Sequence, residues 1–102
     1  MPFIIYVVDQ ENVSDKRESL REAHRAHLRA QGKKLLGSGA LLSNDGKKVI
    51  GGLSILDTDS HKEAERFANE DPYAIAGIRK TTEIRRWRKR WADGEFKAEG
   101  AN

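Results

Sequence analysis

Two residues able to take part in proton transfer, His24 and Asp71, stand in segments whose patterns predict helices. His24 lies within residues 21–28, where the apolar spacing is helical, and Asp71 opens the Asp-Pro-Tyr sequence at residues 71–73. Imidazole titrates near neutral pH, and a carboxylate can orient the ring and stabilise its charged form. If the fold brings the two segments together, we expect His24 and Asp71 to form an acid–base pair that faces a pocket.

Each of these two residues also has a purely structural interpretation. A single inward-facing histidine can be a core residue whose ring is hydrogen-bonded to a backbone carbonyl. An aspartate followed by a proline, as Asp71 is followed by Pro72, is typical of the N-cap of a helix. Capping and catalysis are compatible, because the cap needs only one carboxylate oxygen.

Two arginines near His24 are candidates for binding an anionic group. Arg17 precedes His24 by two helical turns and shares its predicted face, and Arg21 lies between them. A guanidinium forms paired hydrogen bonds to a carboxylate or a phenolate, so Arg17 is predicted to bind the substrate. The alternative is that both arginines form surface ion pairs with Glu18 or Glu22.

Three further residues are candidates for the wall of the pocket. Ser38 can offer a hydroxyl group, and Gly39 lets a ligand approach the backbone closely. Tyr73 can cover the pocket or donate a hydrogen bond. A β-bulge explains Ser38 and Gly39 equally well, and core packing is the alternative for Tyr73.

A metal site is the weaker interpretation of the histidines. His27 lies one turn beyond His24, and two imidazoles with the Asp71 carboxylate could bind a divalent ion. The chain has no cysteine, which excludes thiolate catalysis, iron–sulfur clusters and cysteine-bound zinc. It also has no glycine-rich phosphate loop, nucleophile elbow or dinucleotide-binding motif. We therefore predict chemistry without a metal or a cofactor.

The elements that must position these residues alternate between strand and helix patterns. Short apolar, β-branched and aromatic runs predict strands, and apolar residues spaced by three and four predict helices. The predicted strands are residues 3–8, 34–42, 49–56 and 81–87, and the predicted helices are residues 17–31 and 60–71. Ser14 or Asp15 is the expected N-cap of the first helix and Gly32 its expected end, and Ser60 with Glu63 matches a capping box for the second.

The spacing also divides the first helix into an inner and an outer face. Residues at positions i, i+3 and i+4 share one side of a helix. The predicted inner face comprises Leu20, Ala23, His24, His27, Leu28 and Gln31. The predicted outer face comprises Glu18, Glu22, Arg25 and Arg29.

The predicted order β-α-β-β-α-β indicates an α+β fold of the ferredoxin-like, split-βαβ type, in which both helices lie on one face of an antiparallel sheet. The run from Phe3 to Val8 is apolar nearly throughout, so the other face of the sheet also needs a cover. A second subunit is the simplest cover, and we predict a homodimer. Residues 1–92 are predicted to form one domain, and residues 93–102 a flexible tail.

Length and composition limit the kinds of protein that this chain can be. The chain has 102 residues, of which 37% are hydrophobic and 34% charged, enough for one domain with a modest core. The N-terminus lacks the pattern of a secretory signal, and its apolar run is much shorter than the roughly 20 residues of a membrane span. We expect a cytoplasmic protein that has no membrane partner.

The net charge of +3 is unevenly distributed. Residues 79–90 contain seven basic residues and one acid, Glu83, and Trp87 and Trp91 lie within or beside this segment. Charge beside aromatic rings is a feature of nucleic-acid surfaces. The helices carry many acids, however, and the chain has no recognition helix or ribonucleoprotein motif. We therefore predict a small-molecule substrate and no nucleic-acid partner.

A series of motifs extends over residues 3–87: Arg17…Arg21-x-x-His24…Leu28, Gly32…Leu35-Leu36-x-Ser38-Gly39, Gly46…Gly51-Gly52, Ser60…Glu63-Ala64 and Asp71-Pro72-Tyr73…Gly77. In this order and spacing they resemble the YCII-related family, a branch of the dimeric α+β barrel proteins. The resemblance implies a dimeric ferredoxin-like fold, and it places the family's proposed His–Asp site on His24 and Asp71. Glu22 and Ala40 stand where the family frequently has proline, which affects helix entry and the pocket wall.

One branch of that family resembles a dehydrochlorinase that removes HCl from chlorinated hydroxyhydroquinones in aromatic catabolism. The resemblance therefore implies a cofactor-independent lyase or isomerase acting on a small aromatic or enolisable compound. His24 would move the proton, Asp71 would fix its tautomer and stabilise its cation, and Arg17 and Ser38 would position an oxygen of the substrate. The alternative is an accessory protein that binds a small metabolite in the same pocket without turnover.

Overall fold

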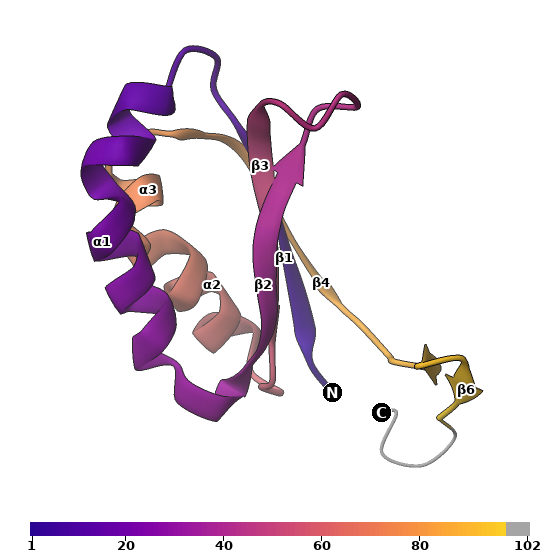
Figure 1. The fold of residues 1–102 in the computed structure, drawn as a ribbon. Coiled ribbons are helices and arrows are strands. Elements are labelled where there is room, and N and C mark those ends of the chain that lie inside the picture. The colour runs from indigo at the N-terminus through magenta and orange to yellow at the C-terminus, as the bar shows by residue number, and fades with distance from the viewer. Residues whose placement is uncertain (98–102) are drawn as a thin grey trace.

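The computed structural model describes residues 1–97, which form an antiparallel four-stranded sheet with helices on one face (Figure 1). The strands are β1 (Phe3–Asp9), β2 (Leu35–Leu42), β3 (Val49–Leu56) and β4 (Arg79–Arg86), in the spatial order β2-β3-β1-β4. The helices are α1 (Ser14–Ala30), α2 (His61–Glu70) and the one-turn α3 (Pro72–Ile75), and a 3-10 turn at Gly32–Lys34 leads into β2. The predicted ferredoxin-like α+β fold is confirmed.

The core lies between the sheet and α2, with one face of β1 at its centre. Phe3, Ile5 and Val7 alternate along β1 and are at most 7% exposed. They pack with buried residues of β3 and α2, namely Leu56, Ala64, Phe67 and Ala68. Complete burial of each large apolar side chain contributes about 1.5–3 kcal/mol, so this layer fixes α2 against the sheet.

The opposite face of β1 is only partly covered. Ile4, Tyr6 and Val8 alternate with the core residues, and Tyr6 is 39% exposed. Leu53 and Ile55 of β3 pair directly with Tyr6 and Ile4, and they are half-buried. Paired residues of an antiparallel ladder lie on the same face. A half-covered apolar surface therefore runs across the two central strands.

The first helix, Ser14–Ala30, begins three residues before the predicted start at Arg17 and ends one residue before the predicted end at Gln31. Val13 occupies the N-cap position and makes no side-chain cap, so the prediction of Ser14 or Asp15 as the cap is wrong. Gly32 follows the helix with a φ of +60°, a left-handed conformation that favours glycine. Ala23 is exposed and not inward-facing, contrary to the prediction.

The second helix begins as predicted, whereas the last strand is shifted. Ser60 Oγ accepts a hydrogen bond from the backbone N–H of Glu63 at 3.1 Å, which is one half of the predicted capping box. The other half is absent, because the Ser60 N–H donates to Thr58 Oγ1 and the Glu63 carboxylate pairs with Lys34. Strand β4 begins at Arg79, two residues before the predicted start, and ends at Arg86. A bulge between Val8 and Asp9 lets Asp9 pair with Arg79. The first residue of β4 and the last residue of β1 therefore lie side by side.

Beyond β4 the chain leaves the body of the domain and forms a small hairpin of β5 (Trp91–Ala92) and β6 (Glu95–Phe96) (Figure 1). The Trp91 and Phe96 rings lie 5.5 Å apart between centroids. The predicted flexible tail, residues 93–102, thus includes one strand of this hairpin, and residues 98–102 lie outside the described residues. In the described part of the chain, every helix is too short or too polar to cross a membrane.

Gly51 in β3 has no room for a side chain. A Cβ at this position would lie 2.1 Å from the carbonyl oxygen of Val7 in the neighbouring strand. We expect Gly51→Ala to lower the free energy of unfolding by about 1–3 kcal/mol, the usual effect of forcing extra atoms into a packed region. Chemical denaturation measures the loss. Gly37→Ala is the matched control, because nothing lies within 4 Å of a Cβ there, and equal losses in the two variants would contradict the prediction.

Candidate active site

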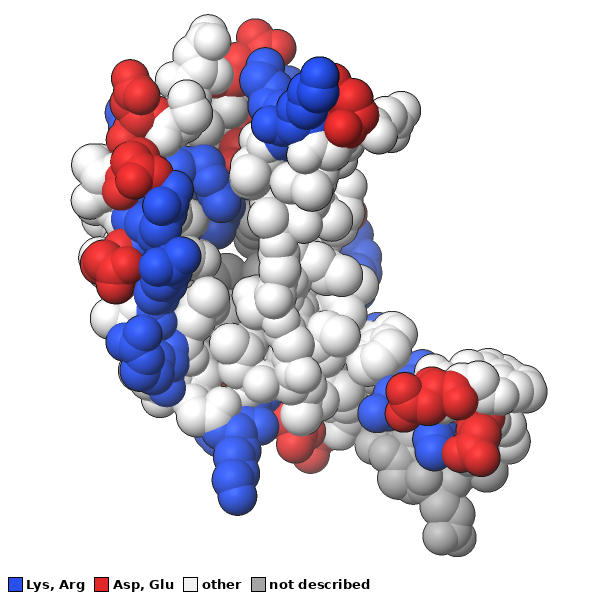
Figure 2. Space-filling view, in the orientation of Figure 1, with Lys and Arg blue, Asp and Glu red and all other residues white. Residues whose placement is uncertain are grey.

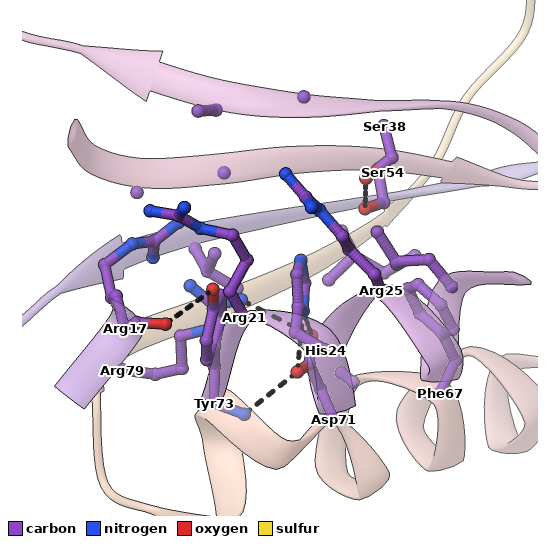
Figure 3. Close-up of a pocket in the computed structure, with 18 residues that line it drawn as sticks. Arg17, Arg21, His24, Arg25, Ser38, Ser54, Phe67, Asp71, Tyr73 and Arg79 are labelled. Carbon is purple, nitrogen blue, oxygen red and sulfur yellow. Dashed lines mark hydrogen bonds and ion pairs between the residues drawn. The ribbon is translucent and has the colours of Figure 1, made fainter. Parts of the chain in front are cut away.

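The structure brings together His24 from α1 and Asp71 from the junction of α2 and α3. His24 Nδ1 lies 2.9 Å from Asp71 Oδ1 and 3.0 Å from Oδ2 (Figure 3). Because a carboxylate accepts hydrogen bonds, Nδ1 is the donor in this contact, and in the neutral ring Nε2 is then the basic nitrogen. The ring edge opposite Asp71 is directed toward the sheet in Figure 3. The imidazole is thus oriented with its basic nitrogen away from the carboxylate.

Asp71 also caps the short helix α3. Its Oδ1 accepts a hydrogen bond from the backbone N–H of Tyr73 at 2.9 Å, and Pro72 occupies the first turn. Asp71 has an extended backbone, as an N-cap residue should. The predicted cap and the predicted contact with His24 are therefore both made by one carboxylate.

The surroundings of Asp71 favour its charged form. Burial raises the pKa of this carboxyl, but the hydrogen bonds from His24 and from the Tyr73 amide lower it, and the charges of His24 and Arg79 lower it further. The net result is a pKa below the ordinary value of 3.8. Asp71 is therefore suited to orient an imidazole and to stabilise its cation, and not to donate a proton itself.

Tyr73 fixes the plane of the imidazole. Its ring stacks on that of His24 with centroids 4.1 Å apart and 13° between the planes. Its hydroxyl donates a hydrogen bond to the backbone carbonyl of Arg17 at 3.2 Å, and the residue is only 3% exposed. This favours the packing interpretation of Tyr73: it joins α3 to α1 underneath His24.

Asp9, which is buried, and Arg79, which is partly buried, are residues of the site that sequence reasoning missed. Asp9 Oδ2 lies 2.6 Å from Arg17 Nη1, and Asp9 Oδ1 lies 2.8 Å from Arg79 Nη1. Arg79 Nη2 also lies 3.5 Å from Asp71 Oδ2. One signal was available, because Asp9 continues the alternation of inward-facing residues in β1 and a carboxylate in that position requires a partner.

Arg17 takes part in this buried network. It pairs with Asp9, and not with Glu18 or Glu22 as the surface alternative predicted. Its side chain is 17% exposed, and its guanidinium carbon lies 4.6 Å from the centroid of the Tyr73 ring. Arg17 borders the cavity described next, and its predicted role in binding the substrate stays a prediction.

A cavity of about 450 Å³ lies between α1 and the sheet, and all six predicted site residues line it (Figure 3). They are Arg17, His24, Ser38, Gly39, Asp71 and Tyr73. Apolar side chains complete the wall, among them Ile5, Val7, Leu28 and Phe67. On the sheet side, the Ser38 hydroxyl is hydrogen-bonded to that of Ser54 at 2.9 Å, and no atom lies within 4 Å of a Cβ built on Gly39. The volume suits a small ring compound.

Arg21 and Arg25 also line the cavity. The assignment of Arg25 to the outer face is wrong for its side chain, which extends from α1 toward the sheet (Figure 3). At the surface, Arg25 Nη1 lies 3.0 Å from Glu22 Oε1, and Arg21 pairs with Glu18. The long, flexible arginine side chain explains why helical spacing alone misplaced Arg25.

His27 has a different environment from His24. Its Nε2 lies 2.8 Å from the backbone carbonyl of Phe67, and its ring stacks on the Phe67 ring with centroids 5.1 Å apart. His27 is thus a structural histidine that joins α1 to α2. Within residues 1–97, no group of three histidine, aspartate or glutamate side chains is arranged to hold a metal ion.

The lowered pKa of Asp71 predicts a loss of stability in acid. A carboxyl whose pKa is lower in the folded chain stabilises it above the unfolded pKa, and this contribution disappears as the pH falls through the folded-state pKa. Below about pH 3.9, the unfolded value, we expect the free energy of unfolding to fall more steeply for the wild-type protein than for Asp71→Asn, whose amide can cap α3 but does not titrate. Urea denaturation across this range measures both curves, and parallel curves would contradict the expectation.

Comparisons with known proteins agree with this geometry. No curated protein was found to match the chain. Among solved structures, 5-chloro-2-hydroxyhydroquinone dehydrochlorinase from Burkholderia phenoliruptrix AC1100, in complex with 2,5-dihydroxybenzoquinone, is similar, with 29% identity and a TM-score of 0.79 over 87% of this chain and 95% of that one. The model of the YCII-related domain matches residues 1–88. The chain therefore belongs to the YCII-related domain family.

Proposed function

We propose that this protein is a cofactor-independent acid–base enzyme, a lyase of the dehydrochlorinase type acting on a hydroxyhydroquinone-like aromatic compound. The observation that carries the proposal is the His24–Asp71 pair, 2.9 Å apart, at the wall of a ring-sized cavity. The similar structure supports the reaction class, since that protein is a dehydrochlorinase with a quinone bound. A base, an orienting carboxylate and a partly apolar wall are the equipment that such a reaction needs.

The proposed step begins from the keto tautomer of a chlorinated hydroquinone, in which the carbon bearing chlorine also carries a hydrogen. His24 Nε2 takes the proton of a ring hydroxyl. The O–H electron pair forms a carbonyl, a ring double bond shifts, and the C–Cl pair leaves with chloride. The products are a quinone, chloride and a protonated His24, so the net loss is HCl and no electron acceptor is required. Asp71 stabilises the imidazolium that forms.

A non-catalytic accessory protein is the competing proposal. The same cavity could hold a small metabolite without changing it, because ring stacking and capping already give His24 and Asp71 structural contacts. Turnover distinguishes the two. A binding protein would retain ligand affinity and release no chloride, whereas a dehydrochlorinase would release one chloride for each molecule of substrate consumed.

We expect His24→Ala to abolish chloride release from 5-chloro-2-hydroxyhydroquinone, and Asp71→Asn to lower the rate substantially, because an amide cannot stabilise imidazolium as a carboxylate does. The double variant should be no slower than His24→Ala alone, since both residues serve one proton transfer. Chloride release under anaerobic conditions measures all three rates. The control is His61→Ala, a histidine that is 54% exposed and does not line the cavity. Full activity in His24→Ala would exclude the proposed base.

We further propose that the chain is a homodimer joined through the uncovered face of the sheet. The apolar side chains on that face, Ile4, Tyr6, Leu53 and Ile55, support the proposal. Small domains gain much of their stability by burying such surfaces against a copy of themselves.

Light scattering at micromolar concentration should give about twice the chain mass of 11.5 kDa. Tyr6→Lys should return the mass to that of one chain, because a charge in an apolar interface is costly to bury. The matched control is Ile75→Lys, which changes an exposed apolar residue in α3 and should leave the dimer intact. A wild-type protein that stays monomeric would refute the interface.

A further inference from the structure

The arginines around the cavity fall into two pairs with different electrostatic environments. Arg17 and Arg79 are 17% and 12% exposed, and the buried carboxylates of Asp9 and Asp71 neutralise them. Two positive and two negative charges therefore cancel within this network. The charges of Arg21 and Arg25 are additional to it.

The acidic partners of Arg21 and Arg25 are exposed at the surface. The Arg21 and Glu18 side chains are 47% and 65% exposed, and those of Arg25 and Glu22 are 56% and 80% exposed. Exposed pairs three residues apart on a helix are weak and are screened by salt. Neither glutamate lines the cavity. An anion inside the cavity would therefore compete easily for both guanidinium groups.

Both arginines are placed to reach a ligand beside His24. Arg21, His24 and Arg25 are spaced by three and four residues on α1, so their side chains leave the helix on neighbouring lines. Lys and Arg side chains gather along the α1 side of the opening between helix and sheet (Figure 2). In Figure 3, Arg25 extends from α1 toward the sheet, over the space that the imidazole faces. Positive charge thus lies at the rim, whereas the apolar wall lies deeper.

We propose that Arg21 and Arg25 determine specificity by binding a carboxylate, or an equivalent strongly acidic group, on the substrate ring. The inference rests on the proposed function, which supplies the aromatic ring of the substrate. It adds that this ring carries a negatively charged substituent. A guanidinium recognises a carboxylate through two parallel hydrogen bonds. The apolar wall would hold the ring, His24 would face its hydroxyl, and the two arginines would hold its anionic substituent. The protein then selects an anionic hydroquinone over a neutral one.

The test compares two ring compounds that differ only in this substituent, hydroquinone and 2,5-dihydroxybenzoate. Isothermal titration calorimetry of the full chain at pH 7 measures the affinity for each. We expect 2,5-dihydroxybenzoate to bind at least tenfold more tightly, the ratio that one charge-assisted contact typically gives. Arg25→Gln and Arg21→Gln should each lose most of this ratio while binding hydroquinone as the wild-type protein does. Arg29→Gln is the control, because Arg29 is exposed on α1 and does not line the cavity.

Equal affinity of the wild-type protein for the two compounds, or no binding of 2,5-dihydroxybenzoate, would overturn the inference. An equal loss in Arg29→Gln would also overturn it, since the preference would then reflect general positive charge and not a defined site. Chloride release from 5-chloro-2-hydroxyhydroquinone is measured separately. Selective binding without chloride release from this compound or from its anionic counterpart, 4-chloro-2,5-dihydroxybenzoate, would sustain the inference and refute the proposed chemistry, and turnover without selectivity would do the reverse.

Discussion

The site depends on one partly buried arginine, Arg79, which lies between two buried carboxylates. Its Nη1 contacts Asp9 at 2.8 Å, and its Nη2 contacts Asp71 at 3.5 Å. Charges removed from water are tolerated when they are paired, and the loss of this shared partner would leave Asp9 with Arg17 alone and Asp71 with only His24 and the Tyr73 amide. The bulge at the end of β1 and the early start of β4 are the backbone features that make this contact possible. Arg79 thus connects the edge of the sheet to the helix junction that carries Asp71.

This arrangement separates two tasks that arginines can perform in one pocket. The paired arginines, Arg17 and Arg79, support the site from behind, and the guanidinium carbon of each lies over the Tyr73 ring on which the imidazole stacks. The rim pair, Arg21 and Arg25, is exposed to solvent and has only exposed acidic partners. Under the proposed function, fixed charge pairs would support the imidazole from below, and the solvent-exposed arginines would meet the ligand at the rim.

Sequence patterns were sufficient for the fold and for six residues of the cavity wall, and they failed where contacts are long-range. The spacing of His24 along α1 and the Asp-Pro pair at Asp71 are local signals, and both were interpreted correctly as inward and capping. The partner of Arg17 could not be derived in this way, because Asp9 comes from another element and acquires its position through a bulge. Arg25 was assigned to the wrong face for a related reason. The helical spacing predicts the direction in which the Cα–Cβ bond leaves the helix, whereas the guanidinium at the end of a long side chain can lie over a different face.

The double role of Asp71 has a consequence for comparing relatives of this protein. Its carboxylate caps α3 whether or not the imidazole acts on a substrate, because the hydrogen bond from the Tyr73 amide is independent of His24. Selection for folding alone would therefore preserve an acid or amide at this position even in a lineage that had lost all chemistry. An aspartate at the helix junction therefore indicates that the fold is kept, and not that the protein is active. The His24 side chain does not cap a helix. The presence or loss of a histidine at this position is therefore the better indicator of activity among members of the family.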